Sequence, residues 1–339
     1  MSAVDTGTWR RGRWVAGAAV LVTALLVRPA LLPNRPGHLG SLLETFLPWL
    51  GLALPVLLPA ALLRRSATAG LAVTLALLVW TVRFLPPAAD GGRTGLTAVQ
   101  HNVDDANPDP AGTARTLADS GADLVALEEL LPERLPDYQA VLGADRPYRA
   151  VEGTVGLWSR YPLTDVRPVD LKPRALTADW RRALRATLHT GAGETAVYVV
   201  HLPSVRLGPG GYGTDRRDES ARLLAAVLAA EPLPRVILLG DLNGALDDRG
   251  LAPVTRLLGE NGRREFSWPR SFPLARIDHV LTRGAKVSGS RTLPPTPSDH
   301  LPVAARIDLG PPRPGRAGPV AEPNESQPGR SGRGPPRLG

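Results

Sequence analysis

Residues 236–243 read Val-Ile-Leu-Leu-Gly-Asp-Leu-Asn, an apolar run that ends in a carboxylate and an amide. The apolar part predicts a buried strand at Val236–Leu239. A carboxylate directly after a buried strand is costly in a protein core and much less costly in the wall of a cleft. Asp241 and Asn243 are therefore candidates for a functional site, although a simple turn after Gly240 is the alternative.

Polar residues also stand at or beside the ends of five further predicted strands. They are Asn102 in Leu96–Asn102, Glu128 and Glu129 at the end of Leu124–Glu128, His201 in Ala196–His201, Asp278 inside Arg276–Thr282, and Asp299 with His300 before Val303–Leu309. Folds of the α/β class collect their site residues at the carboxyl ends of strands. Each residue alone could be a turn or a cap, but six such endings in one region indicate one shared site.

These strands alternate with helical stretches between residues 94 and 309. Ala111–Ser120 and Glu219–Ala230 predict helices, and Gly156–Ser159 predicts a further strand. Leu224 and Leu228 belong to the apolar stripe of the second helix. Mixed strands and helices over this length predict one α/β (α+β) domain at 94–310, in which helices cover the sheets.

The basic charge of the chain lies outside this domain. The chain has 40 Lys and Arg against 32 Asp and Glu, a formal net charge of +8, and no cysteine. Residues 1–93 and 311–339 carry the excess, whereas 94–310 hold 26 basic and 27 acidic side chains. A groove for nucleic acid normally carries a basic stripe, so the charge does not favour a nuclease. The lack of cysteine excludes a disulfide scaffold, a thiolate zinc site and a cysteine nucleophile.

Three apolar blocks precede the domain, at Trp14–Leu32, Phe46–Leu63 and Ala67–Leu85. Each has about the 20 residues with which an α-helix crosses a bilayer, and each lacks a polar face. We therefore predict three transmembrane helices within residues 14–86. Buried helices of a soluble domain are the alternative for all three, and a cleaved signal peptide is the alternative for the first.

Arginines set the predicted orientation of these helices. Arg10, Arg11 and Arg13 precede the first block, and Arg64 and Arg65 separate the second block from the third. Positive residues stay on the cytoplasmic side, so residues 1–13 are predicted to be cytoplasmic. Three crossings then place the α/β domain outside the cell membrane. The Pro-, Gly- and Arg-rich tail, 311–339, has no apolar periodicity and is predicted to be disordered.

Six short motifs occur in an order that resembles the endonuclease/exonuclease/phosphatase (DNase I-like) superfamily. They are Gln100-His101-Asn102-Val103-Asp104, Leu127-Glu128-Glu129-Leu130, His201, Gly240-Asp241-Leu242-Asn243, Arg276-Ile277-Asp278-His279 and Ser298-Asp299-His300-Leu301-Pro302. The segment Gly156–Leu163 is similar to a further segment of that superfamily. The resemblance covers about residues 94–309 and implies a four-layer sandwich of two β-sheets flanked by helices. With the apolar blocks, the chain resembles the actinobacterial branch that includes teicoplanin-resistance proteins of the VanJ type.

The resemblance also implies a divalent metal, usually Mg²⁺, with Mn²⁺ as the alternative. Magnesium takes oxygen ligands and keeps several waters, so a few carboxylates and an amide suffice. By this resemblance Glu129 is the leading metal ligand, and Asn102, Asp104 and Asp299 are further candidates. For Asn102 and Asp104 the alternative is a turn within a loop.

The same resemblance assigns roles to five residues. Asp241 orients or deprotonates the attacking water, and Asn243 positions Asp241 and the phosphate. His201 and His300 contact the phosphoryl oxygens, and Asp278 holds His300 in its tautomer. Because a neighbouring carboxylate raises the pKa of a histidine, we expect His300 to be cationic when substrate binds.

One residue departs from the family pattern. Glu128 stands where the family usually has Gln, and it either shifts metal affinity or points away from the site. His101 and His279 alternate with site residues along their strands, so we interpret both as structural. Arg160 and Arg185 are candidates for binding phosphate, with surface salt bridges as the alternative.

Three functions follow from these patterns. The favoured one is a membrane-anchored, extracytoplasmic, metal-dependent phosphoesterase that hydrolyses a lipid-linked phosphate or pyrophosphate. The resemblance suggests undecaprenyl pyrophosphate as substrate and a role in cell-wall metabolism or glycopeptide resistance. Its partners are then the lipid bilayer and a phosphorylated lipid, and no protein partner is inferred. Trp180-Arg181-Arg182 are candidates for contact with the bilayer, with a solvated loop as the alternative. The alternatives are a surface nuclease acting on DNA or RNA and a non-catalytic binding module.

Overall fold

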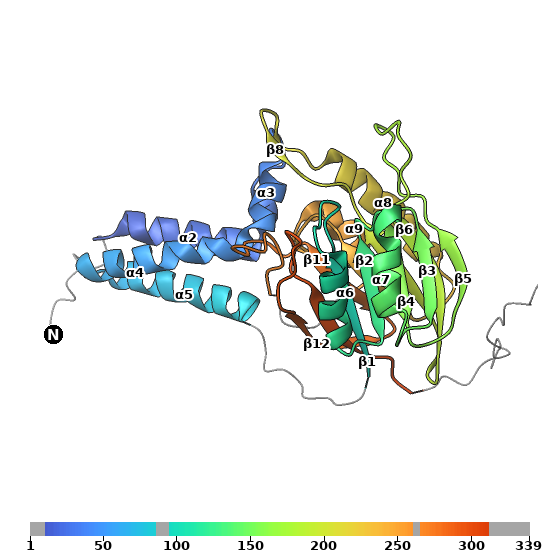
Figure 1. Ribbon diagram of the computed structural model, residues 1–339. Coiled ribbons are helices and arrows are strands. Elements are labelled where there is room, and N and C mark those ends of the chain that lie inside the picture. Colours follow the sequence, from blue (N-terminus) through green and yellow to red (C-terminus); the bar gives the residue numbers. More distant parts are fainter. Residues whose placement is uncertain (1–10, 86–94, 260–264, 312–339) are drawn as a thin grey trace, which may run out of the picture.

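A computed structural model describes residues 11–85, 95–259 and 265–311 of the chain (Figure 1). The predicted disordered tail lies almost entirely outside these ranges, as do residues 1–10 and the segment that joins the apolar region to the α/β domain.

Two mixed β-sheets form the centre of the α/β domain. Their strands are β1 (Leu96–Asn102), β2 (Leu124–Glu128), β3 (Tyr148–Glu152), β4 (Val155–Ser159), β5 (Leu163–Pro168), β6 (Ala183–Thr190), β7 (Gly193–His201), β10 (Val236–Asp241), β11 (Asp278–Arg283), β12 (Lys286–Thr292) and β13 (Val303–Asp308). One sheet has the order β12-β13-β1-β2-β4-β3 and the other β11-β10-β7-β6-β5. Ala98 and Leu124 of the first sheet share a buried apolar cluster with Val197 and Ile237 of the second, so the sheets pack face to face.

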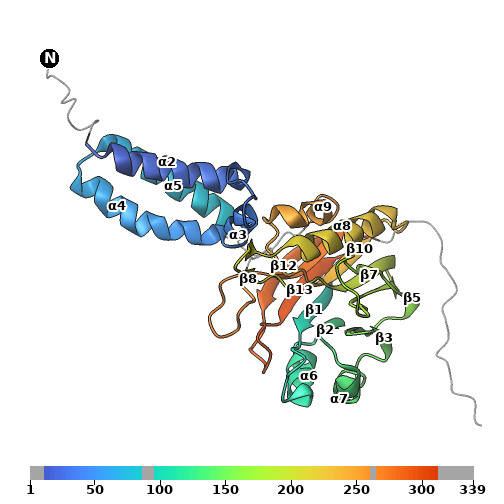
Figure 2. The same cartoon turned by 90° about the horizontal axis from the view of Figure 1, so that it is seen from above.

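Helices cover the outer face of each sheet. On the first sheet lie α6 (Pro110–Asp119) and α7 (Leu135–Leu142), and on the second lie α8 (Asp215–Ala230) and α9 (Ala252–Thr255). Figure 2 shows the two sheets between these pairs of helices. Leu117 of α6 packs on the first sheet, and Leu224 of α8 packs on the second. The predicted sandwich of two sheets flanked by helices is therefore confirmed.

The strand register brings the predicted strand ends together. Parallel pairing of β1 with β2 sets Asn102 opposite Glu128, and parallel pairing of β7 with β10 sets His201 opposite Asp241. Antiparallel pairing of β10 with β11 sets Asp278 opposite Asp241. The carboxyl ends of the central strands of both sheets therefore meet at one rim.

The N-terminal region is helical, but its helices differ from the three predicted blocks. They are α2 (Arg13–Val27), η1 (Pro29–Leu31), α3 (Leu39–Thr45), η2 (Leu47–Ala53), α4 (Leu54–Leu63) and α5 (Ala67–Phe84). Among the residues that the structure describes, α5 is the one helix long and apolar enough to cross a bilayer by itself, and α3 with the segment Leu47–Leu63 has the length and composition only as one span bent by 78°. The first block is shortened because Arg28 precedes Pro29, and a residue before proline is disfavoured in a helix.

The three longer N-terminal helices pack side by side and project from the α/β domain (Figure 2). Small residues fill the seam between them, among them Ala19 of α2, Ala61 of α4 and Ala69 of α5. Large apolar side chains point outward instead: Leu62 is 68% exposed and Val82 is 76% exposed. This is the reverse of the pattern of a water-soluble helix bundle.

Two arginine–carboxylate pairs are among the contacts that join the N-terminal region to the α/β domain. Arg249 donates from Nε to both carboxylate oxygens of Glu44 at 3.0 and 2.9 Å, and its backbone N–H donates to the same carboxylate at 2.9 Å. Arg83, in the last turn of α5, pairs with Asp247 at 2.6 Å. Glu44 is buried, so its pairing with Arg249 decides whether α3 stays docked.

We expect Arg249→Leu to release α3 from the α/β domain. The variant leaves the buried Glu44 carboxylate without its ion-pair partner and with only the bond from the backbone N–H of residue 249, which costs about 3 kcal/mol. Hydrogen exchange at residues 39–45 should therefore become about 100-fold faster. Arg256→Leu removes an exposed arginine from the same segment and serves as the control. Unchanged protection of residues 39–45 in Arg249→Leu would contradict the role given to this ion pair.

Candidate active site

The polar side chains at the rim surround a cavity of about 480 Å³. Seven of the nine residues predicted to be catalytic or metal-ligating line it directly: Asn102, Asp104, Glu129, Asp241, Asn243, Asp299 and His300. The other two, His201 and Asp278, lie behind them and contact Asp241 and His300 respectively. Leu42, Thr45 and Phe46 of the N-terminal region form part of the same wall.

Asn102 links the two sheets at the base of this cavity. Its side-chain amide donates to Glu129 and to Asp241, both at 3.1 Å, and its side-chain oxygen accepts from the backbone N–H of Asp104 at 3.1 Å. Asp104 and Glu129 both adopt left-handed backbone conformations, with φ of 64° and 57°. Such conformations are strained for glutamate in particular and are concentrated at functional sites. The turn at Glu129 separates its carboxylate from that of the buried Glu128.

Asp241 is buried and is held by Asn243. The carboxylate accepts from the backbone N–H of Asn243 at 2.8 Å and from its side-chain amide at 3.2 Å. That amide also donates to the carbonyl oxygen of Leu202 at 2.9 Å, which fixes its orientation. Burial raises the pKa of Asp241 to about 7, with a further rise from Asp278 and an opposing effect from His300. A carboxylate with a pKa near neutral pH is suited to accept a proton.

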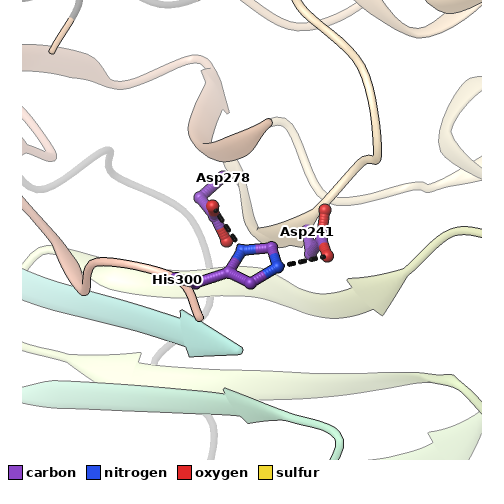
Figure 3. Close-up of side chains that lie close together, drawn as sticks. All are labelled: Asp241, Asp278 and His300. Carbon is purple, nitrogen blue, oxygen red and sulfur yellow. Dashed lines mark hydrogen bonds and ion pairs between the residues drawn. The ribbon is translucent and has the colours of Figure 1, made fainter. Parts of the chain in front are cut away.

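His300 lies between two aspartates, as Figure 3 shows. Its Nδ1 contacts the carboxylate of Asp278 at 2.8 Å, and its Nε2 lies 3.8 Å from that of Asp241. Burial lowers the pKa of His300, but Asp278 and Asp241 outweigh it and raise the pKa to about 10. Burial raises the pKa of Asp278, but the His300 cation outweighs it and holds the pKa near 2. The pair is therefore an imidazolium and a carboxylate at neutral pH.

His201, unlike His300, is neutral. Burial lowers its pKa well below the ordinary value, and Arg182 lowers it further, so the ring is neutral. Arg182 Nη1 lies 3.3 Å from Nδ1 of His201. Since arginine has no acceptor, Nδ1 must accept, and the ring proton sits on Nε2. Nε2 has no hydrogen-bond partner among the described residues, and it lies 3.7 Å from both Glu129 and Asp241. This buried N–H lies beside two carboxylates that line the cavity and is available to donate to a ligand oxygen.

Glu128 is buried beneath the site and does not line the cavity. The side-chain amide of Gln100 donates to Glu128 and to Asp278, each at 2.9 Å. Burial raises the pKa of Glu128 well above 4.5, and Asp278 and Asp241 raise it further. The neutral acid has nearly the shape of glutamine, which explains how a carboxyl group stands where the family usually has an amide.

We expect Glu128→Gln to be stabilising at alkaline pH and to leave activity close to wild type. A raised carboxyl pKa contributes stability that is full below about pH 4.5 and is lost as pH rises through the raised value. Glutamine does not ionise, so the variant does not lose this stability at high pH. Its Tm should therefore exceed the wild-type Tm by a margin that grows with pH, with about 2–4 °C for each kcal/mol of difference in the free energy of unfolding. Thermal unfolding from pH 5 to 9 measures this. Glu133→Gln, at an exposed position, is the control; equal pH slopes for wild type and Glu128→Gln would refute the interpretation.

The residues around Glu129 are fitted to a magnesium ion. Single oxygens of Asp104, Asp105 and Glu129 all lie within 4.8 Å of one another, beside the amide of Asn102. Their oxygens are hard donors, which Mg²⁺ prefers, and the surface around them is partly exposed, which leaves room for the waters that a bound Mg²⁺ keeps. Asp299 lies apart from this group and accepts from the indole N–H of Trp268 at 3.1 Å. Glu129, Asn102 and Asp104 thus remain candidate ligands, and Asp105 joins them.

The structure does not bring the two predicted phosphate-binding arginines to the cavity. The buried Arg185 donates to both carboxylate oxygens of Glu231 at 3.1 Å and also pairs with Asp165. Arg160 donates to the carbonyl oxygen of Gly121 at 3.0 Å and pairs with Asp123 at 3.3 Å. Both guanidinium groups are occupied by carboxylates distant in the sequence, so Arg160 forms the surface salt bridge of the alternative, whereas the salt bridges of Arg185 are buried.

Other residues of the site were missed or assigned elsewhere from the sequence. The sequence predicts contact with the bilayer or a solvated loop for Arg182, and its contact with His201 has no local signal in the sequence. Ser298 donates to the carbonyl oxygen of Asn102 at 2.7 Å and accepts from the backbone N–H of His300 at 3.0 Å, which ties the last motif to β1. The small polar residue at the start of Ser298-Asp299-His300 was the available signal. His101 and His279 contact Thr296 and the carbonyl oxygen of Gly244, outside this network.

Two sheets packed face to face between helices, with carboxylates and imidazoles at one rim, define the DNase I-like class of α/β sandwich proteins. The chain belongs to the endonuclease/exonuclease/phosphatase family, whose model matches residues 99–300, from β1 to His300. The members of this family are phosphoester hydrolases.

Solved structures share the fold at low sequence identity. The beta toxin of Staphylococcus aureus is 16% identical, with a TM-score of 0.53 over 62% of this chain and 99% of its own. A mannosyl-6-phosphatase of Bacteroides thetaiotaomicron is 18% identical, with a TM-score of 0.52 over 62% and 99%. A beta toxin mutant with bound magnesium ions is 15% identical, with a TM-score of 0.50 over 63% and 99%. A comparison with curated proteins finds no match.

Proposed function

We propose that the protein is a membrane-anchored, metal-dependent phosphoesterase whose catalytic domain faces outward and hydrolyses a lipid-linked phosphate or pyrophosphate. One observation carries the proposal: the cavity that holds Asp241 and His300 is partly walled by Leu42 and Phe46 of the apolar N-terminal region. Undecaprenyl pyrophosphate is the proposed substrate. We further propose that the protein belongs to the VanJ-type branch of the family and acts in cell-wall metabolism or glycopeptide resistance.

The charge states of the site suit hydrolysis by water. Asp241 accepts the proton of the attacking water, and Asn243 keeps its carboxylate oriented for this step. His300, as the imidazolium, donates from Nε2 to a phosphoryl oxygen, while Asp278 keeps it charged. His201 donates from Nε2 as a neutral ring. A divalent ion held by Glu129 and its neighbours supplies further compensation for charge on the phosphoryl oxygens when it is bound. The magnesium in the related beta toxin mutant supports Mg²⁺ as that ion.

The N-terminal helices support a membrane location. The helix α5 has the length and composition of a transmembrane helix, and large apolar side chains on α4 and α5 face outward. The start of α2 and the turn between α4 and α5 lie at the end of the bundle that is remote from the catalytic domain (Figure 2). Arginines cluster at those two places, which favours a cytoplasmic position for that end and an extracytoplasmic position for the catalytic domain.

The test is phosphate release by the full-length chain in detergent micelles, with Mg²⁺ and with EDTA. The substrates are a polyprenyl diphosphate, phosphatidic acid, plasmid DNA and RNA. We expect metal-dependent release from the polyprenyl diphosphate and little cleavage of nucleic acid, because the catalytic domain lacks net positive charge. Cleavage of DNA or RNA without lipid phosphate release would establish the nuclease alternative. No cleavage of any substrate, with metal bound, would favour the binding module.

A further inference from the structure

A second cavity, of about 240 Å³, lies between the N-terminal helices and the catalytic domain. Its apolar lining comes from Pro48, Trp49, Trp80, Phe84, Leu246 and Phe266. This size is below the usual range for a complete small ligand, so the cavity has room for a segment of one chain.

The second cavity adjoins the active-site cavity. Thr45 lines both. Two short segments contribute residues to both cavities. Phe46 and Ile277 line the active-site cavity. Pro48 and Arg276, which are close to them in the sequence, line the second cavity. A ligand whose phosphate lies at Asp241 therefore has an adjoining place for whatever is attached to that phosphate.

Most polar groups of the second cavity are already bonded elsewhere. The indole N–H of Trp80 donates to the carbonyl oxygen of Pro48, and that of Trp49 donates to the carbonyl oxygen of Leu274, both at 2.7 Å. Glu44 and Asp247, which also line the cavity, pair with Arg249 and Arg83. What the walls offer to a ligand is therefore mainly aromatic and aliphatic surface.

The apolar surface continues from this cavity along α5. Trp80 and Phe84 stand one turn apart, with ring centroids 6.2 Å from each other. On the same helix Val82 is 76% exposed and Leu78 is 57% exposed. An apolar chain that leaves the cavity can thus follow α5 without meeting water, if α5 lies in a bilayer.

We infer that the second cavity binds the part of a lipid's hydrocarbon chain that lies next to its phosphate. This inference rests on the proposed function and specifies the class of substrate. The substrate is a phosphate or diphosphate attached to one long hydrocarbon chain, and the remainder of that hydrocarbon chain lies along α5. A phosphatidic acid carries two acyl chains and fits this single cavity less well.

Filling the cavity tests the inference. We expect Leu246→Trp to lower kcat/KM for a long-chain polyprenyl diphosphate about 10-fold, with less than about a twofold change for inorganic pyrophosphate, because only a substrate with a hydrocarbon chain needs the cavity. Both are assayed with the full-length chain in detergent micelles. Leu223→Trp makes the same replacement at an exposed position of α8 and should change neither value. Equal losses on the two substrates, or none, would overturn the inference while leaving the proposed function standing.

A binding measurement on the wild-type chain decides the question even if Leu246→Trp fails to fold. A polyprenyl diphosphate with a diazirine near its diphosphate is photolysed on the protein, and labelled peptides are identified by mass spectrometry. We expect labels on the peptides that contain Trp80 or Phe266. Labels confined to other surfaces would refute the inference. Labels at these peptides without hydrolysis of any substrate would retain the chain site and reject the proposed phosphoesterase.

Discussion

Asp241→Asn is expected to lower kcat for phosphate release by about 10³-fold. The amide keeps the size of the carboxylate and its bond from the backbone N–H of Asn243, so the fold is retained. It cannot accept a proton from water. Because the pKa of Asp241 lies near 7, wild-type activity should rise with pH up to about that value and then level off. The variant should lose this ascending limb.

The measurement is a pH–rate profile from pH 5 to 9 on the substrate cleaved best, with thermal unfolding as the check on folding. Asp308→Asn replaces an exposed aspartate at the end of β13 and should behave as wild type. A folded Asp241→Asn protein with near-normal kcat would show that another group takes the proton.

The site could be predicted because it depends on local sequence. The strands that supply Asn102, His201 and Asp241 each contain an apolar run, and parallel pairing of β1 with β2 and of β7 with β10 brings the ends of these strands to one edge. The polar residue that ends each run was therefore visible without knowledge of the sheet order. This applies to Asn102, His201 and Asp241.

What could not be predicted depends on contacts between distant residues. The strand β6 contains Arg185 and Thr187, which look like surface residues, but both are buried because Glu231 and Asp165 satisfy the guanidinium group. The strand β6 itself was missed, as were β3, β5 and β12, which have little apolar patterning. The docking of α3 beside the active-site cavity requires the pair between Glu44 and Arg249, which are 205 residues apart.

Removal of the charge partner of His300 should have a second large effect. In Asp278→Asn the pKa of His300 should fall toward its ordinary value of 6.5, because the carboxylate at 2.8 Å contributes most to raising it. At pH 8 the ring is then neutral and loses its charge-assisted bond to the phosphoryl oxygen. We expect kcat to fall about 10²–10³-fold at pH 8, with partial recovery near pH 6. Because protonation of Asp241 lowers activity at pH 6 in both proteins, the recovery is measured as a rise in the ratio of variant to wild-type kcat from pH 8 to pH 6.

Stability should report the same pair independently of turnover. The raised pKa of His300 contributes stability that is full below about pH 6.5 and is lost as pH rises through about 10. The lowered pKa of Asp278 contributes stability that is present above about pH 3.8 and is lost as pH falls through about 2. Wild-type Tm should therefore decline between pH 6.5 and 10, and His300→Gln should lack the part of that decline that belongs to this ring. His189→Gln, near the surface on β6, should keep it. If His300→Gln and wild type lose Tm equally across this range, His300 is not cationic in the folded protein, and its proposed contact with the phosphoryl oxygen must be that of a neutral donor.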